Sequence, residues 1–274
     1  EVFPSNNLEL ALWMESERLL HPVINKIGVD TQNEVVKEEK RTRMDNQPYG
    51  RFQAVVKENL FKKHPYRWAT IGSMEHLDAA TLEEFQAFNK KFYIPNNAVL
   101  VVAGDFKKDQ AKKWIAQYFG TIPKGAPIKR EQFIEEPITE TIKARFEDNN
   151  IQIPAIVAAY RTPSMKTRDA RVLDLISSYL SDGKSSKLYK KIVDDKKIAL
   201  QVGAFSNSQE DYGMYLIYGL PMGQNTTESL VKEIDEEIAK MQNELISEKD
   251  FQKLQNKFES NYVSNNASVE GIAD

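Results

Sequence analysis

The stretch Ile198–Leu220, IALQVGAFSNSQEDYGMYLIYGL, decides the fold class of the second half of the chain. Apolar and aromatic residues gather at its two ends, 198–205 and 214–220, and a polar segment separates them, which is typical of two paired strands. We therefore expect a hairpin or meander here. Periodicity predicts a further strand at 151–160 and helices at 168–180, 185–193, 227–245 and 248–262.

The first half of the chain mixes helices with a strand in a similar way. Asn97–Asp105, NAVLVVAGD, reads as a buried strand that ends in a turn. Apolar spacing and capping residues predict five helices, at 7–20, about 31–46, 52–60, 81–92 and 107–119. We expect an α+β fold of two domains of related design, residues 1–122 and 147–274, joined by a Pro- and Gly-containing linker at 123–146.

The composition excludes several classes of function. With 37 Lys and Arg against 40 Asp and Glu, the net charge is −3, so no overall positive field draws the chain to nucleic acid. The chain has no cysteine, which excludes disulfides, thiolate nucleophiles and cysteine-bound metals. No run of 18 apolar residues occurs, so we expect no transmembrane helix. Any metal must therefore bind to His, Asp or Glu.

The segment Val35–Arg41, VVKEEKR, carries the candidate site because its charges can be placed on a helix. At about 100° per residue, Val35 and Val36 define an apolar direction, and Glu39 lies close to it. Glu38 lies about 110° away from that direction and is free to be solvated. We therefore expect the Glu39 carboxylate to point inward, where it must be paired, hydrogen-bonded or bound to a cation.

Helical geometry leaves two interpretations of Glu39 open. It can pair with Arg43, one turn along the same face, as in many helices. Alternatively, it is a metal ligand whose partners lie elsewhere. The three histidines form neither a His-x-x-x-His pair nor a His-Glu-x-x-His motif, and no Gly-x-Ser-x-Gly or Gly-x-Gly-x-x-Gly sequence is present. The chain cannot complete a histidine metal site by itself.

Several segments, taken in order, resemble the M16 (pitrilysin/insulinase-type) zinc peptidases. In the first half they are Asn7–Met14, Val35–Arg41, Asp45–Gly50 and Tyr93–Asp105. In the second half, Tyr179–Tyr189 is similar to the domain that follows in the same family. The resemblance spans nearly the whole chain and is strongest to bacterial members built from shorter chains. It implies two tandem domains, each an antiparallel-rich sheet with helices on one side, the first truncated at its N-terminus.

The resemblance also implies the zinc ligands. In this family a His-x-x-Glu-His motif supplies two ligands and the Glu that activates water, and a Glu on a later helix is the third ligand. The family pattern at that helix is two apolar residues, two variable ones and the ligand, which implies Glu39 as the ligand and Glu38 as the alternative. Gln32 and Arg43 are the supporting residues. The His-x-x-Glu-His motif is absent, so we expect an internal fragment that does not hydrolyse peptides by itself.

Partners follow from the same resemblance. Family domains that hold substrate carry an Arg and a Tyr seven residues apart, but the corresponding positions here are Val193 and Leu200. We therefore expect a second half or subunit to complete a chamber around a peptide substrate. The expected function is a fragment of a zinc metalloendopeptidase of a bacterial periplasm or cell envelope. The alternative is a non-catalytic partner that shapes the chamber and binds no metal.

Overall fold

The structure is a computed structural model that describes all 274 residues. Its contacts divide the chain into two compact units that alternate along the sequence. Unit 1 consists of residues 1–43, 69–134 and 261–274, and unit 2 consists of residues 44–68 and 135–260. The division after residue 134 falls within the segment expected to be a linker, which forms neither helix nor strand.

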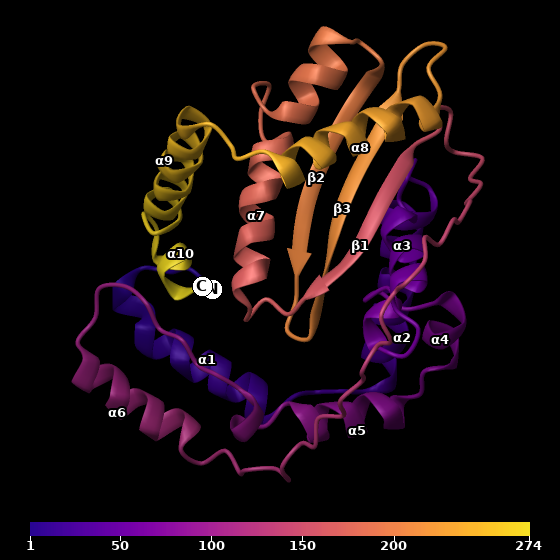
Figure 1. The fold of residues 1–274 in the computed structure, drawn as a ribbon. Helices are drawn as coiled ribbons and strands as arrows, with labels where there is room; N and C mark the ends of the chain where they lie inside the picture. Colours follow the sequence, from indigo (N-terminus) through magenta and orange to yellow (C-terminus); the bar gives the residue numbers. More distant parts are fainter. The chain divides into compact units, whose positions relative to one another are not determined.

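Unit 2 is built on a three-stranded antiparallel sheet of order β1-β3-β2 (Figure 1). The strands β2 (Ala199–Ser208) and β3 (Tyr212–Pro221) form the hairpin predicted from the sequence. β1 (Ile156–Pro163) pairs with the other side of β3. The strand predicted at 151–160 is therefore present, but it begins only after Pro154, whose nitrogen cannot donate a ladder hydrogen bond.

Helices pack on both faces of this sheet. α7 (Arg168–Ser181) and α8 (Thr227–Asn243) cover one face. The core on that face contains buried residues from the helices, the strands and the intervening segment, namely Leu180, Leu188, Ile192, Ala199, Val202, Ala204, Tyr215, Ile217, Leu230 and Ile234. α3 (Phe52–Leu60) packs on the opposite face with Met214 and Leu216. The expectation of helices on one side is therefore wrong for unit 2, because side chains alternate across β3 and both of its faces are apolar.

The segment between α7 and β2 is helical as expected, but it is a π-helix, Tyr189–Asp195. Lys191 in this segment makes ion pairs of 3.0 to 3.1 Å with Glu233, Glu236 and Glu237 of α8. The lysine side chain is only 17% exposed. A nearly buried cation needs such partners, and together they hold the π-helix against α8.

Unit 1 consists of helices joined by irregular segments. α1 (Leu8–Leu20) and α6 (Lys108–Phe119) pack around Leu8, Leu12 and Ala111. The other α-helices assigned wholly to this unit are α2 (Lys26–Lys40), α4 (Met74–Ala79), α5 (Leu82–Phe92) and α10 (Val269–Ala273). α4 and α10 have no counterpart in the prediction, because such short helices show no clear periodicity. None of the helices in either unit combines the length and the apolar character of a membrane span.

The strand predicted at Asn97–Asp105 does not form. The backbone is extended at Ala98, but the segment pairs with no strand, and Val99 is 89% exposed. A strand needs a neighbour to donate and accept its ladder hydrogen bonds, and the three strands of the structure all lie in unit 2. The expectation of a buried strand in the first half is therefore wrong.

Candidate functional site

α2 (Lys26–Lys40) carries the candidate residues, and local hydrogen bonds set its beginning. The Asn25 side chain accepts a hydrogen bond of 2.8 Å from the Gly28 amide and caps the helix. The helix therefore begins earlier than the predicted start at about residue 31. At its C-terminal end the chain continues as a π-helix, Arg41–Asp45, a conformation that is frequent at functional sites.

One face of α2 packs on α4 through polar contacts. The Asn33 side chain donates a hydrogen bond of 3.2 Å to the carbonyl oxygen of Leu77. Lys37 makes ion pairs with Asp78 and Glu34. Hydrogen bonds to these two carboxylates raise the pKa of the Lys37 ammonium above its ordinary value. This face of the helix is therefore occupied by contacts within unit 1.

Glu39 lies on a different face of α2, which is open. Its Oε1 atom is 2.7 Å from Nη1 of Arg43, and the two side chains are 38% and 75% exposed. Helical geometry places Gln32 and Val35 within about 40° of Glu39 around the axis, and both are exposed. Gln32 is two turns away, about 10 Å along the axis, so it shares this face with Glu39 without contacting it. The structure thus brings Glu39 and Arg43 together and leaves Gln32 apart.

The Glu39 side chain was expected to point inward, but it is only partly buried in the structure. Val36 is partly buried, whereas Val35 is 52% exposed. Two adjacent residues point about 100° apart on a helix, so they define an apolar direction poorly. The face of α2 that packs on α4 is polar and includes Asn33 and Lys37.

Glu38, the alternative ligand, is more exposed than Glu39. Its side chain is 66% exposed and pairs with Arg41 at 3.2 Å. Its other oxygen accepts a hydrogen bond of 3.4 Å from the Thr42 hydroxyl. Each of the two glutamates thus has one arginine partner, and Glu39 is distinguished by lying on the face that includes Gln32.

The residues of the chain do not assemble a complete zinc site. Zinc in proteins takes at least three side-chain ligands, and no group of three His, Asp or Glu side chains lies close enough to hold a metal ion. His21 pairs with Glu17 near the end of α1, and His76 lies in α4. His64 belongs to unit 2, where it is buried. Within residues 1–274, Glu39 therefore belongs to no group of three such side chains.

The positions of the family's Arg and Tyr pair carry apolar side chains in unit 2. Val193 lies in the π-helix and packs, partly buried, against the core. Leu200 lies in β2 and is 50% exposed. Neither side chain can donate or accept a hydrogen bond. Unit 2 therefore has no polar side chain at these two positions.

Unit 2 contains a buried carboxylate that no sequence pattern revealed. Glu135 is 8% exposed, and its Oε1 atom accepts hydrogen bonds of 2.7 to 2.8 Å from the amides of Lys62, Lys63 and His64. Its Oε2 atom lies 3.3 Å from Arg161. Burial opposes ionisation, but the three amides and Arg161 outweigh it, so the pKa of Glu135 lies below its ordinary value. All the contacts described for this carboxylate lie within unit 2.

His64 extends the same cluster. Its ring is buried, its Nδ1 atom accepts a hydrogen bond of 3.1 Å from the Tyr66 amide, and its Nε2 atom lies 3.3 Å from Asp211 Oδ2. The ring also packs against Tyr66 and Tyr212, with centroid distances of 4.1 and 5.4 Å. Asp211 and Glu135 are more than 70 residues away from this loop in sequence. Local spacing gives no sign of such a cluster.

Known proteins similar to this chain identify its family. Residues 79–258 match the family described as the peptidase M16 inactive domain. The chain is 27% identical to the zinc protease PqqE of Helicobacter pylori over 97% of this chain and 61% of that protein. It is 25% identical to a protease from Helicobacter pylori of known crystal structure, with a TM-score of 0.87 over 99% of this chain and 66% of that one. The non-peptidase homologue YmxG of Helicobacter pylori is 25% identical over 56% of this chain and 35% of its own length.

These matches agree with the resemblance inferred from the order of sequence segments. The chain spans 61% of the length of the zinc protease it matches. The family match covers more than half of the chain and includes the whole sheet of unit 2, from β1 to β3. The chain belongs to the peptidase M16 family.

Proposed function

We propose that this chain is part of a zinc-dependent metalloendopeptidase that hydrolyses peptides or unfolded polypeptides inside a closed chamber, with Glu39 as its third zinc ligand. The name of the relative PqqE, a zinc protease, supports this function. The observation that carries the proposal is the accessible carboxylate of Glu39, whose partner Arg43 is itself 75% exposed. Such a carboxylate can bind a cation without leaving a buried charge unpaired.

The candidate residues have different roles in the proposed zinc site. Glu39 contributes one oxygen ligand, and Arg43 positions its carboxylate through their contact at 2.7 Å. Gln32 supports the same helix face by hydrogen bonding to a neighbour in the intact site. The histidine ligands and the water-activating Glu belong to a His-x-x-Glu-His sequence that residues 1–274 do not contain. Zinc at such a site polarises the scissile carbonyl and lowers the pKa of bound water.

We also propose a domain division, a partner and a compartment for this chain. We assign residues 1–122 and 147–274 to two M16-type domains with a linker at 123–146. The apolar residues Val193 and Leu200 support a second half or subunit that supplies the polar contacts to peptide. The periplasm or cell envelope of a bacterium is the proposed compartment, on the basis of the family resemblance.

A non-catalytic M16 partner is the second candidate. The match to a domain described as inactive and the similarity to a non-peptidase homologue favour it. The glutamate at position 39 favours the enzyme, because a subunit that binds no metal does not require a carboxylate at this place. The two candidates therefore differ in whether Glu39 binds zinc.

Zinc titration of the full-length protein that contains this chain tests the proposal. We expect one zinc ion per chain, bound at least about 100-fold more weakly by Glu39→Ala, because the variant lacks a direct ligand. Glu38→Ala is the matched control, since it also removes a helical carboxylate that pairs with an arginine. We expect its zinc affinity to be unchanged. Arg43→Met should bind zinc about tenfold more weakly if it positions the carboxylate.

Two results would reject parts of this proposal. Equal zinc affinity in Glu39→Ala and the wild type would mean that Glu39 serves only the pair with Arg43. A full-length protein that binds no zinc and cleaves no unfolded peptide would establish the non-catalytic partner instead.

A further inference from the structure

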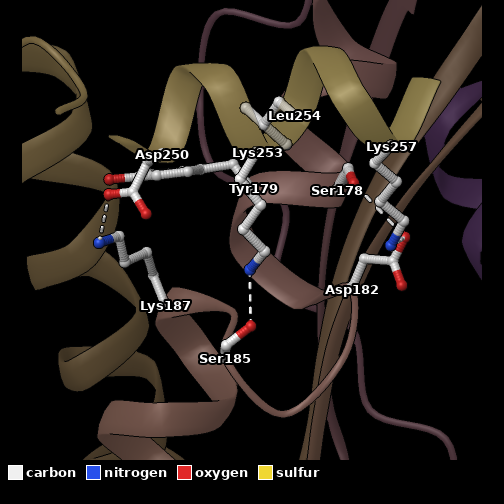
Figure 2. A pocket seen from close by; sticks show the side chains of 9 residues that line it. All are labelled: Ser178, Tyr179, Asp182, Ser185, Lys187, Asp250, Lys253, Leu254 and Lys257. Carbon is white, nitrogen blue, oxygen red and sulfur yellow. Dashed lines mark hydrogen bonds and ion pairs between the residues drawn. The ribbon is translucent and has the colours of Figure 1, made fainter. Parts of the chain in front are cut away.

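Three polar contacts join one face of α9 (Glu248–Asn265) to the end of α7 and the loop that follows it (Figure 2). They are Lys187–Asp250 at 2.9 Å, Lys253–Ser185 at 2.6 Å and Lys257–Asp182. We call these contacts the α9 seam. Its three members on α9 are three or four residues apart, so they lie on one side of the helix. All six residues belong to unit 2.

Two of the three seam contacts are ion pairs, and in the third Lys253 donates a hydrogen bond to the neutral Ser185 hydroxyl. On α9 the seam consists of Asp250, Lys253 and Lys257. These residues face Lys187, Ser185 and Asp182, respectively. The loop is rich in Gly, Lys and Ser, as phosphate-binding loops are. The cavity among the seam side chains is about 10 Å³, however, which is room for about one water molecule. The lysines here thus serve contacts between helix and loop rather than a phosphate site.

One buried apolar side chain, Leu254, adds to the polar contacts of α9. Leu254 lines the same cavity and is buried, but no α9 side chain belongs to the apolar core on either face of the sheet. Phe251 and Phe258 of α9 remain 43% and 39% exposed. α8, in contrast, places Leu230 and Ile234 fully within the core. α9 therefore depends on its seam to a degree that α8 does not.

We propose that the polar contacts of the seam hold α9 against α7, and that rising ionic strength releases the helix while the sheet of unit 2 stays folded. We call this salt-sensitive attachment the latch. The side chains of Lys187 and Asp250 are 37% and 28% exposed, so dissolved ions can screen their attraction. Release leaves the apolar clusters on the two faces of the sheet intact, because no residue of α9 belongs to them. It uncovers Leu254 and the surface of α7 near Tyr179, whose ring lies 5.2 Å from Lys187 Nζ.

Amide hydrogen exchange at two salt concentrations tests this latch. The Debye length falls from about 10 Å at 0.1 M to about 3 Å at 1 M sodium chloride. We expect the amides of residues 251–260 to exchange about fivefold faster at the higher salt, as partly exposed ion pairs weaken. The amides of β3 serve as the internal reference and should change less than twofold. Exchange in α9 that is unchanged or slower at high salt overturns the proposal.

Variants outside α9 separate docking from the stability of the helix itself. Lys187→Gln removes one seam charge without altering the α9 sequence, and it should accelerate α9 exchange at low salt and reduce its salt dependence. Lys184→Gln is the matched control, an exposed lysine of the same loop, and should behave as the wild type. Lys257→Gln tests the other end of the seam. If only Leu254→Ala accelerates exchange, apolar packing holds the helix and the latch is rejected.

Discussion

Glu135 in unit 2 and Glu39 in unit 1 are both carboxylates with an arginine partner, but their surroundings differ. Glu135 is 8% exposed and accepts three backbone hydrogen bonds in addition to its contact with Arg161. Glu39 has a side chain that is 38% exposed, on an open helix face. The first carboxylate has its acceptor sites filled by the protein, whereas the second retains room for another partner.

This difference separates a structural carboxylate from a candidate ligand. A buried carboxylate must be fully hydrogen-bonded in the fold, since an unpaired buried charge costs several kcal/mol. An accessible carboxylate is under no such constraint and can exchange arginine for a metal ion. Burial and a lowered pKa therefore indicate structure at Glu135, while accessibility supports the ligand role proposed for Glu39.

Removing the buried carboxylate should have the largest effect. We expect Glu135→Ala to lower the free energy of unfolding of unit 2 by about 3 kcal/mol, because three amides and Arg161 lose a buried partner. Hydrogen exchange of the β3 amides as a function of urea measures this loss. Glu136→Ala is the control, since Glu136 is 79% exposed and pairs only with Lys63 in the structure. It should change stability by less than about 0.5 kcal/mol. Equal effects of the two variants would contradict the structural role of Glu135.

Lowering the pH should also reveal the structural role of Glu135, with a smaller loss of stability than Glu135→Ala. The folded-state pKa of Glu135 is lowered, so its ionisation stabilises the fold fully above the unfolded-state pKa of about 4.3. That contribution is lost as the pH falls through the folded-state pKa. We expect the stability of unit 2 to fall more steeply below about pH 4 in the wild type than in Glu135→Gln. Parallel curves of stability against pH would show that Glu135 has no such linkage.

The exposed ion pair between Glu39 and Arg43 should have the smallest effect on stability. A double-mutant cycle with Glu39→Gln and Arg43→Met is expected to give a coupling energy of about 0.3 to 0.5 kcal/mol, since both side chains reach solvent. Thermal unfolding of the four proteins at low salt measures it. A coupling above about 2 kcal/mol would mean that this pair is structural and would weaken the ligand role of Glu39.

Local chemistry allowed much of the secondary structure to be predicted. The helix predicted at 52–60 has those bounds in the structure, and the one predicted at 81–92 begins after Thr81. Thr81 and Glu84 form a capping box, so the start of that helix depends on residues three apart. Spacing and caps act over one or two turns, which a sequence displays directly.

The candidate site was predictable only in part, for the same reason. The pair of Glu39 with Arg43 is one of the two alternatives that helical spacing left open, because the two residues lie one turn apart. Its exposure depends on what packs on α2, and the contact with α4 joins Asn33 to Leu77, 44 residues away. The Glu135 cluster joins residues more than 70 apart and left no local sign.

The sequence by itself determined most of the longer helices, the β2–β3 hairpin and the family, because each depends on short-range spacing and residue identity. Only the tertiary structure decided which apolar runs became strands. Residues 199–208 pair with β3, whereas residues 97–105 remain unpaired in unit 1. Tertiary structure likewise decided which carboxylates are buried. Strand pairing and burial require partners brought together from distant parts of the chain, and local patterns do not record where those partners lie.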